Sequence, residues 1–153
     1  MRIVLCSSEA FPFAKTGGLA DVAGALPLSL ERLGQEVIVV MPRYACVAKA
    51  GIPMTLLKKG FSTATIGKNI KVYFIEHNAY YDRPFLYGDK TGDYPDNLMR
   101  FSFYCKKTLE LLKAIKFPAD IIHCNDWQTA LLPVFLKYSL QNDAFYKNIK
   151  TVF

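Results

Sequence analysis

The sequence lacks the motifs that mark several common kinds of site. Its four cysteines include no C-x-x-C pair, which excludes a zinc ribbon and a thioredoxin-type site. It contains neither the G-x-G-x-x-G motif of dinucleotide-binding proteins nor the P-loop motif. The apolar run at residues 3–6 is too short for a signal-peptide core or a membrane span. We therefore expect a cytoplasmic protein with reduced cysteines and no membrane partner.

The charge balance is basic, but the basic residues form no extended run. The net charge of +6 comes from 19 Lys and Arg residues against 13 Asp and Glu residues. Basic residues adjoin one another only in pairs such as Lys58-Lys59, so we do not expect nucleic acid as a partner. We interpret the excess as a solvated surface; compensation by an acidic partner domain is the alternative. A hydrophobic content of 52% is typical of a globular domain.

Apolar runs and helical periodicities alternate along the chain. Residues 3–6, 37–41 and 121–124 are short runs that predict strands buried on both faces. Residues 19–33 and 98–112 carry apolar side chains at helical spacing. This alternation predicts an α/β domain over residues 1–153, with a Rossmann-like, mostly parallel sheet flanked by helices. The remaining expected segments are strand pieces at 56–57 and 63–66, strands at 70–75 and 151–153, a loop at 77–96 and a helix at 130–138.

Ligands of such sheets bind outside the carboxyl ends of the strands, which directs attention to residues 7–18. Within them, Lys15 and the pair Gly17-Gly18 precede a helix. Two glycines, a helix N-terminus and a lysine suit a phosphate or diphosphate group, although a plain tight turn would explain the glycines equally well. Asp21 in the first helical turn either satisfies the helix dipole or accepts a hydrogen bond at the cleft.

A second candidate segment follows the strand at residues 121–124. Asp126 stands where the strand gives way to a helix, so it either caps that helix or orients a substrate and stabilises developing positive charge. We expect His123 and Trp127 to pack in the core.

The long segment at 77–96 combines carboxylates, amides and aromatic rings. Such groups suit a carbohydrate, which needs hydrogen bonds and a stacking plane, and they also suit an ordinary ordered loop. Asp96 is expected to cap the following helix, on which Arg100 should face solvent.

Taken together, the motifs resemble those of one enzyme family, the glycogen and starch synthases of bacterial and plant type. Within the His123–Thr129 motif, Asn125 stands where many bacterial members have histidine, and asparagine at this position resembles the starch synthase version of the motif. Five blocks of the chain carry the resemblance in order: Ser8–Phe13, Lys15–Val22 with Gly24–Pro27, Tyr81–Gly88, Asp93–Phe101 and His123–Thr129.

The resemblance implies a retaining GT-B glycosyltransferase with two Rossmann-like domains, of which this chain would be the incomplete N-terminal one. The implied reaction transfers glucose from ADP-glucose to the non-reducing end of an α-1,4-glucan, without a metal or other cofactor. A C-terminal domain of the same chain would carry most of the groups that hold the nucleotide sugar. The resemblance assigns residues as follows: catalytic, Asp126; donor-binding, Lys15, Gly17, Gly18 and Asp21; glucan- or glucosyl-binding or shaping the acceptor side, Tyr87, Asp96, Asn97 and Arg100.

Two other interpretations remain open from the residues themselves. One is a non-catalytic sugar- or nucleotide-binding α/β module. The other is a different GT-B enzyme, such as a sucrose or trehalose-phosphate synthase, although the Lys15–Leu19 block argues against it. Because the second wall of the cleft would lie in the C-terminal domain, we expect the isolated 153 residues to be inactive.

Overall fold

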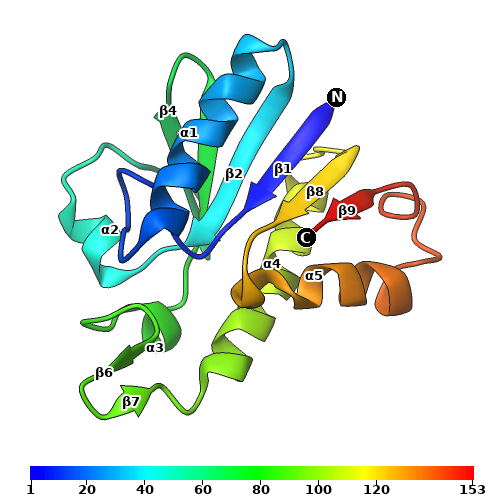
Figure 1. Cartoon of the computed structure of the whole chain (residues 1–153). Coiled ribbons are helices and arrows are strands. Elements are labelled where there is room, and N and C mark those ends of the chain that lie inside the picture. Colours follow the sequence, from blue (N-terminus) through cyan, green and yellow to red (C-terminus); the bar gives the residue numbers. More distant parts are fainter.

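A sheet with the strand order β3-β4-β5-β2-β1-β8-β9 forms the centre of the computed structural model, which describes residues 1–153 (Figure 1). One part is parallel, because β1 pairs with β2 and β8, β2 with β5, and β8 with β9. The parallel strands are β1 (Arg2–Cys6), β2 (Glu36–Pro42), β5 (Ile70–Ile75), β8 (Ile121–Cys124) and β9 (Lys150–Val152).

The other edge of the sheet is antiparallel. Strand β4 (Phe61–Ile66) runs opposite to β5, and β3 (Thr55–Lys58) runs opposite to β4. The sequence identified these strand pieces but assigned them no direction. Direct sequence neighbours joined by short turns pair antiparallel, whereas a parallel neighbour needs a longer crossover.

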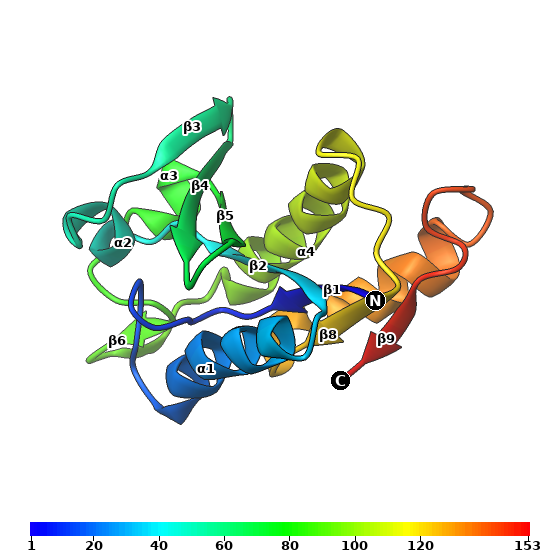
Figure 2. The same ribbon diagram turned by 90° about the horizontal axis from the view of Figure 1, so that it is seen from above.

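Helices cover both faces of the sheet (Figure 2). Helix α1 (Gly18–Arg32) lies on one face and α4 (Asn97–Ala114) on the other. Helix α1 contains Pro27 and is followed by Gly34, whose φ of +75° suits the predicted end of the helix. No helix is both long enough and apolar enough to cross a membrane. The shorter elements are α2 (Ala45–Lys49), α3 (Asn78–Tyr81), β6 (Gly88–Asp89), β7 (Gly92–Asp93), η1 (Trp127–Thr129), α5 (Leu131–Val134) and η2 (Phe135–Ser139).

The first turn of α4 contradicts the predicted orientation of its side chains. Leu98 is 72% exposed, whereas Arg100 is completely buried. Arg100 donates hydrogen bonds to the Tyr80 carbonyl (2.8 Å) and to Asn97 Oδ1 (2.6 Å). This turn therefore packs against the preceding loop, and only the later turns present the expected apolar stripe to the sheet.

The segment after β8 also departs from the predicted stripe. Val134 and Tyr138 are exposed, and Leu132 and Leu136 are buried in their place. The backbone passes from a 3₁₀ turn through one α-helical turn into a π-helix. Because the number of residues per turn changes along this segment, a fixed 3.6-residue period does not identify the buried face.

Candidate functional site

Two turns meet where β1 and β8 end. The strands are parallel neighbours with Cys6 opposite Cys124, so their carboxyl ends lie at the same edge. The Asn125 backbone N–H and its side-chain Nδ2 both donate to the Cys6 carbonyl, at 3.0 and 2.9 Å. The segments after these two strands lie at the carboxyl ends, as predicted, and the hydrogen bonds hold them side by side.

A cavity of about 370 Å³ opens between the two turns and the loop that precedes α4. Four residues expected at the site from the sequence lie together in its wall: Gly17, Gly18, Tyr87 and Asp126. The other residues of the wall are Glu9, Thr16, Leu19, Asp93, Trp127 and Gln128.

The glycine pair is not required by the fold. Gly17 has an extended backbone (φ −149°), and neither glycine has a positive φ. A Cβ added at Gly17 or Gly18 would meet no atom within 4 Å. Helix α1 begins here without a side-chain cap, so no side chain of the cap residue accepts from the N–H groups of its first turn. The backbone conformation and the local packing do not require these glycines, and a close approach of a ligand to this backbone stays a prediction.

Glu9 holds this turn in place through hydrogen bonds, a role that was not predicted from the sequence. Its side chain is only 3% exposed and accepts hydrogen bonds from the backbone N–H groups of Thr16 and Gly17. The Thr16 hydroxyl and the Tyr87 hydroxyl also donate to it, each at 2.6 Å. The available signal was a carboxylate three residues after the apolar strand β1, because a carboxylate buried there needs several donors around it.

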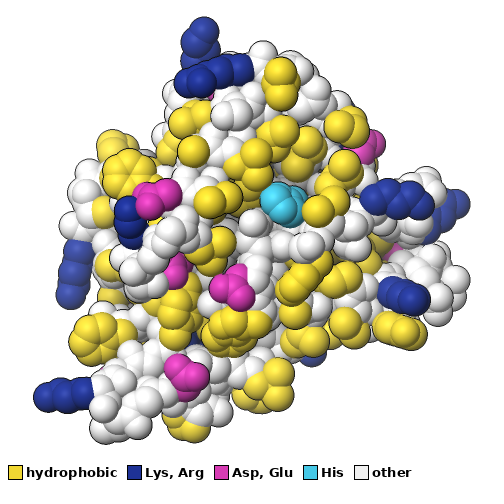
Figure 3. All heavy atoms as spheres, viewed as in Figure 1, with side chains coloured by type: hydrophobic (Ala, Val, Ile, Leu, Met, Phe, Trp, Pro, Cys, Tyr) yellow, Lys and Arg dark blue, Asp and Glu magenta, His cyan; other side chains and the backbone are white.

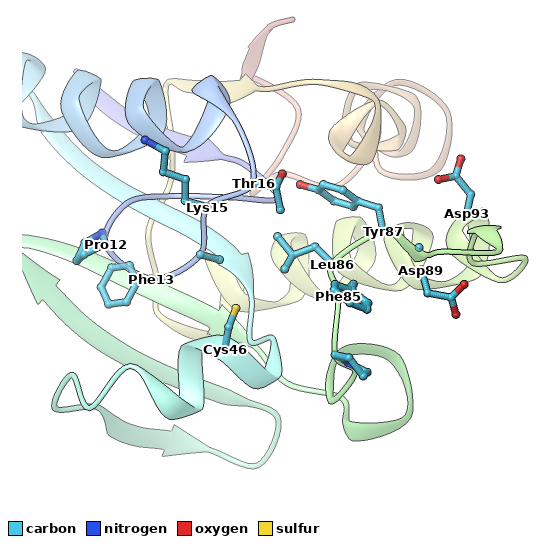
Figure 4. Close-up of a pocket in the computed structure, with 14 residues that line it drawn as sticks. Pro12, Phe13, Lys15, Thr16, Cys46, Phe85, Leu86, Tyr87, Asp89 and Asp93 are labelled. Atoms are coloured by element: carbon cyan, nitrogen blue, oxygen red, sulfur yellow. The ribbon is translucent and has the colours of Figure 1, made fainter.

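Tyr87 divides the cavity from a neighbouring one. Its hydroxyl lies 2.7 Å from Ser8 Oγ and donates to Glu9, and the hydroxyl end of the side chain points toward Thr16 (Figure 4). Burial, and then the hydrogen bond to Glu9, raise the pKa of Tyr87 well above its ordinary value, so the hydroxyl stays protonated at neutral pH. The neighbouring cavity, of about 650 Å³, shares Thr16, Tyr87 and Asp93 with the first.

Asp126 adopts a backbone conformation that normally belongs to glycine, with φ +63° and ψ 174°. Such a conformation costs about 1–3 kcal/mol for a residue with a side chain. The predicted cap is confirmed on the 3₁₀ turn, because Asp126 Oδ1 accepts from the Trp127 N–H at 2.7 Å. Thr129 Oγ1 donates to the Asp126 carbonyl at 2.9 Å and holds the turn.

Trp127 lies in the cavity wall and not in the core, contrary to the sequence prediction. Its side chain is 48% exposed, and its ring is supported by Phe101 (5.0 Å between centroids) and Tyr87 (6.2 Å). His123 is also only partly buried. An aromatic ring that is fixed on one side and open on the other offers a plane on which a sugar can stack.

The cavity is acidic although the chain is basic overall. Three carboxylates line it, those of Glu9, Asp93 and Asp126, and no lysine or arginine does. On this face of the molecule most basic side chains lie at the periphery, and acidic ones gather over the carboxyl ends of the strands (Figure 3). Lys15 lies in the neighbouring cavity, where it extends along α1 and pairs with Asp21 at 2.7 Å (Figure 4).

Three residues predicted near the glucan line neither cavity. Arg100 is completely buried, which fits a role in shaping the acceptor side and not a direct contact with the glucan. Asp96 pairs with Arg83 at 2.6 Å and makes no cap, because its carboxylate is engaged by the guanidinium. The Asn97 amide donates to the Tyr87 carbonyl at 2.8 Å. These residues position the loop that carries Tyr87.

The sheet order defines a Rossmann-like α/β domain, and a cavity lies at the carboxyl ends of its strands, where the ligands of such sheets bind. The chain belongs to the starch synthase catalytic-domain family, whose model matches residues 2–153.

Curated relatives and a solved structure agree with this family. Glycogen synthase 2 of Geobacter sulfurreducens is 39% identical, and the glycogen synthase of Geotalea daltonii is 42% identical; each alignment covers 100% of this chain and 34% of the relative. The catalytic domain of starch synthase IV from Arabidopsis thaliana, bound to ADP and acarbose, superimposes with a TM-score of 0.80 at 28% identity. That match covers 97% of this chain and 32% of the Arabidopsis chain. The chain thus spans about a third of the length of these relatives.

Proposed function

We propose that this chain forms one wall of the catalytic cleft of an α-glucan synthase, which transfers glucose from ADP-glucose to an α-1,4-glucan. The single observation that carries the proposal is the open space in front of Gly17 and Gly18, at an uncapped helix N-terminus and within the same cavity as Asp126. Membership of the family and the ADP-bound relative support the choice of reaction and donor.

The distribution of charge favours one orientation of the donor. Its diphosphate is repelled by the carboxylates of Asp93 and Asp126 and attracted by the free N–H groups at the start of α1. The glucosyl group then lies toward Asp126 and Trp127. In this arrangement the glucosyl carbon faces a carboxylate, and the diphosphate faces a helix N-terminus.

The orientation matches the charges that develop during transfer. The bond from glucose C1 to the diphosphate oxygen breaks, a bond from C1 to the glucan hydroxyl oxygen forms, and the hydroxyl proton leaves with ADP. Positive charge develops on the glucosyl ring and negative charge on the leaving diphosphate. The Asp126 carboxylate would stabilise the first, and the α1 N–H groups the second.

A second domain is needed to complete this cleft, and we propose that it belongs to the same longer protein. The relatives are about three times as long as the matched part, which supports the proposal. The four free cysteines fit a reducing compartment, and we place the reaction in the cytoplasm on that basis.

The test is glucosyl transfer to glycogen by the full-length product, with ADP-glucose and UDP-glucose in parallel. We expect transfer from ADP-glucose, and its loss in the Asp126→Ala variant. Asp143→Ala is the matched control, because Asp143 lies in neither cavity and pairs with Lys113 on the surface. A folded full-length protein that transfers glucose from neither donor would refute the proposal and favour a sugar-binding module.

A further inference from the structure

Gln128 is a buried polar residue in the wall of the cavity whose side chain has no partner. It is 2% exposed, and its Oε1 atom accepts no hydrogen bond. Buried side-chain amides are normally paired, so an unpaired one at a cavity wall requires an explanation. The other buried polar atoms without partners belong to Arg43, Tyr44, Ser62 and Arg100, none of which lines the cavity.

The backbone holds Gln128 firmly in this place. The Gln128 carbonyl accepts from the buried Cys105 thiol at 3.4 Å. The flanking turn is closed by Thr129, whose N–H and hydroxyl both donate to the Asp126 carbonyl, at 3.1 and 2.9 Å. The backbone of Gln128 is therefore fixed together with the turn that carries Asp126 and Trp127. A residue of the cavity wall thus carries a buried amide oxygen that has no partner.

We propose that the Gln128 amide hydrogen-bonds a hydroxyl of a glucose unit held in this cavity, and that it selects for sugars with a hydroxyl at that position. An amide and a sugar hydroxyl can each donate and accept, so they satisfy one another. The adjacent Trp127 ring supplies a stacking plane for the same glucose unit. The inference rests on the proposed function, and the glucose unit belongs either to the donor or to the end of the glucan.

The experiment compares Gln128→Met with the wild type in the full-length protein. Methionine has nearly the same length and shape but cannot replace the amide hydrogen bond. Initial rates are measured with ADP-glucose varied at saturating glycogen, and then with glycogen varied at saturating ADP-glucose. We expect kcat/KM to fall about 10- to 100-fold for the substrate whose hydroxyl is bound. The substrate that shows the fall identifies the source of the glucose unit.

Two further variants separate binding from folding. Gln128→His keeps a donor and an acceptor, so it should recover most of the lost kcat/KM. Gln141→Met is the matched control on the exposed surface outside the cavity, and it should behave as the wild type. Unchanged kcat/KM for both substrates in a folded Gln128→Met variant would overturn the inference while leaving the proposed function intact. An inactive wild type would instead refute the proposed function.

A measurement on the wild type gives an answer even if Gln128→Met does not fold. ADP-glucose analogues and maltooligosaccharides that each lack a single ring hydroxyl are compared as substrates. A site built around a hydroxyl discriminates strongly against the analogue without it, because the buried amide is then left unpaired. We expect one such analogue to react at least 100-fold more slowly than the others. Equal reactivity of all the analogues would overturn the inference.

Discussion

The two turns at the carboxyl ends of β1 and β8 differ in whether the residue type suits the backbone conformation. The turn after β1 has Gly17 and Gly18 in ordinary backbone conformations, with empty space where a Cβ would be. The turn after β8 has Asp126, with a carboxylate side chain, in a conformation that favours glycine. Folding alone would favour residues with side chains at positions 17 and 18 and a glycine at position 126.

The residue types of both turns fit the proposal that a ligand enters the cavity between them. At the first turn a side chain is absent where the fold would accept one. At the second a side chain is present although the backbone is strained by it. Gly24 is the contrasting case, because a Cβ there would lie 2.8 Å from the Phe11 carbonyl oxygen, so packing alone explains that glycine.

The largest effect is expected at Asp126. Asparagine can make the same cap and tolerates a positive φ, so Asp126→Asn should change the free energy of unfolding by less than about 0.5 kcal/mol. Without the negative charge, kcat for glucosyl transfer should fall about 100- to 1000-fold. Both are measured on the full-length protein, by denaturant unfolding and by transfer kinetics.

The Asp126→Gly variant tests whether the backbone strain at position 126 serves the site. It should relieve the backbone strain at the cost of a weaker cap, with a net gain of about 1 kcal/mol in the free energy of unfolding and a similar loss of activity. A glycine variant that is both active and less stable would remove the argument that the strain serves the site.

A smaller effect is expected at the glycine turn. Gly18→Ala places a methyl group in open space, so stability should stay the same or rise slightly, because alanine favours a helix. The methyl group obstructs the approach of a ligand, and kcat/KM for ADP-glucose should fall about 10-fold or more. Gly24→Ala is the control, with about 1–3 kcal/mol lost from the free energy of unfolding through its clash with Phe11. A Gly18→Ala variant with unchanged kinetics would contradict the comparison.

The smallest effect is expected at Asp96, whose residue type is explained by folding alone. The hydrogen-bonded Arg83 guanidinium lowers the pKa of Asp96, so the pair adds to stability above the ordinary value of 3.8. That contribution is lost as the pH falls through the lowered pKa. Both side chains are partly exposed, so Asp96→Asn should lose only about 0.5–1 kcal/mol at neutral pH and nothing in strong acid. Equal destabilisation at every pH would exclude the ion pair as its cause.

Most of the fold could be predicted, because short buried strands and long helices leave clear hydrophobic patterns. The buried runs in β1, β2 and β8 identified the parallel core, and the pattern of α4 gave its length. The predictions were wrong where loops replaced the sheet as the packing partner, as at Arg100, and where the helical period changed, as at Val134. Neither event leaves a signature in the local sequence.

The site could be predicted only in part. The glycine pair, Tyr87 and Asp126 were found from the family resemblance and from their places after strands or in the long loop, and the structure brings them to one cavity. Glu9 and Gln128 were missed, because their importance depends on burial and on partners far away in the sequence. Lys15 pairs with Asp21 along α1 and lines the neighbouring cavity, so its predicted contact with the donor stays a prediction.

The hydrogen bonds that assemble the cavity join distant parts of the chain. Ser8 and Tyr87 are 79 residues apart, and Asn125 and Cys6 are 119 residues apart. During synthesis, the strand at residues 121–124 must therefore emerge before the cavity can form, although its glycine turn is made early. Contacts of such long range are slow to form and cooperative with the sheet that bears them. Substrate binding would consequently report the completion of folding more faithfully than helix content does.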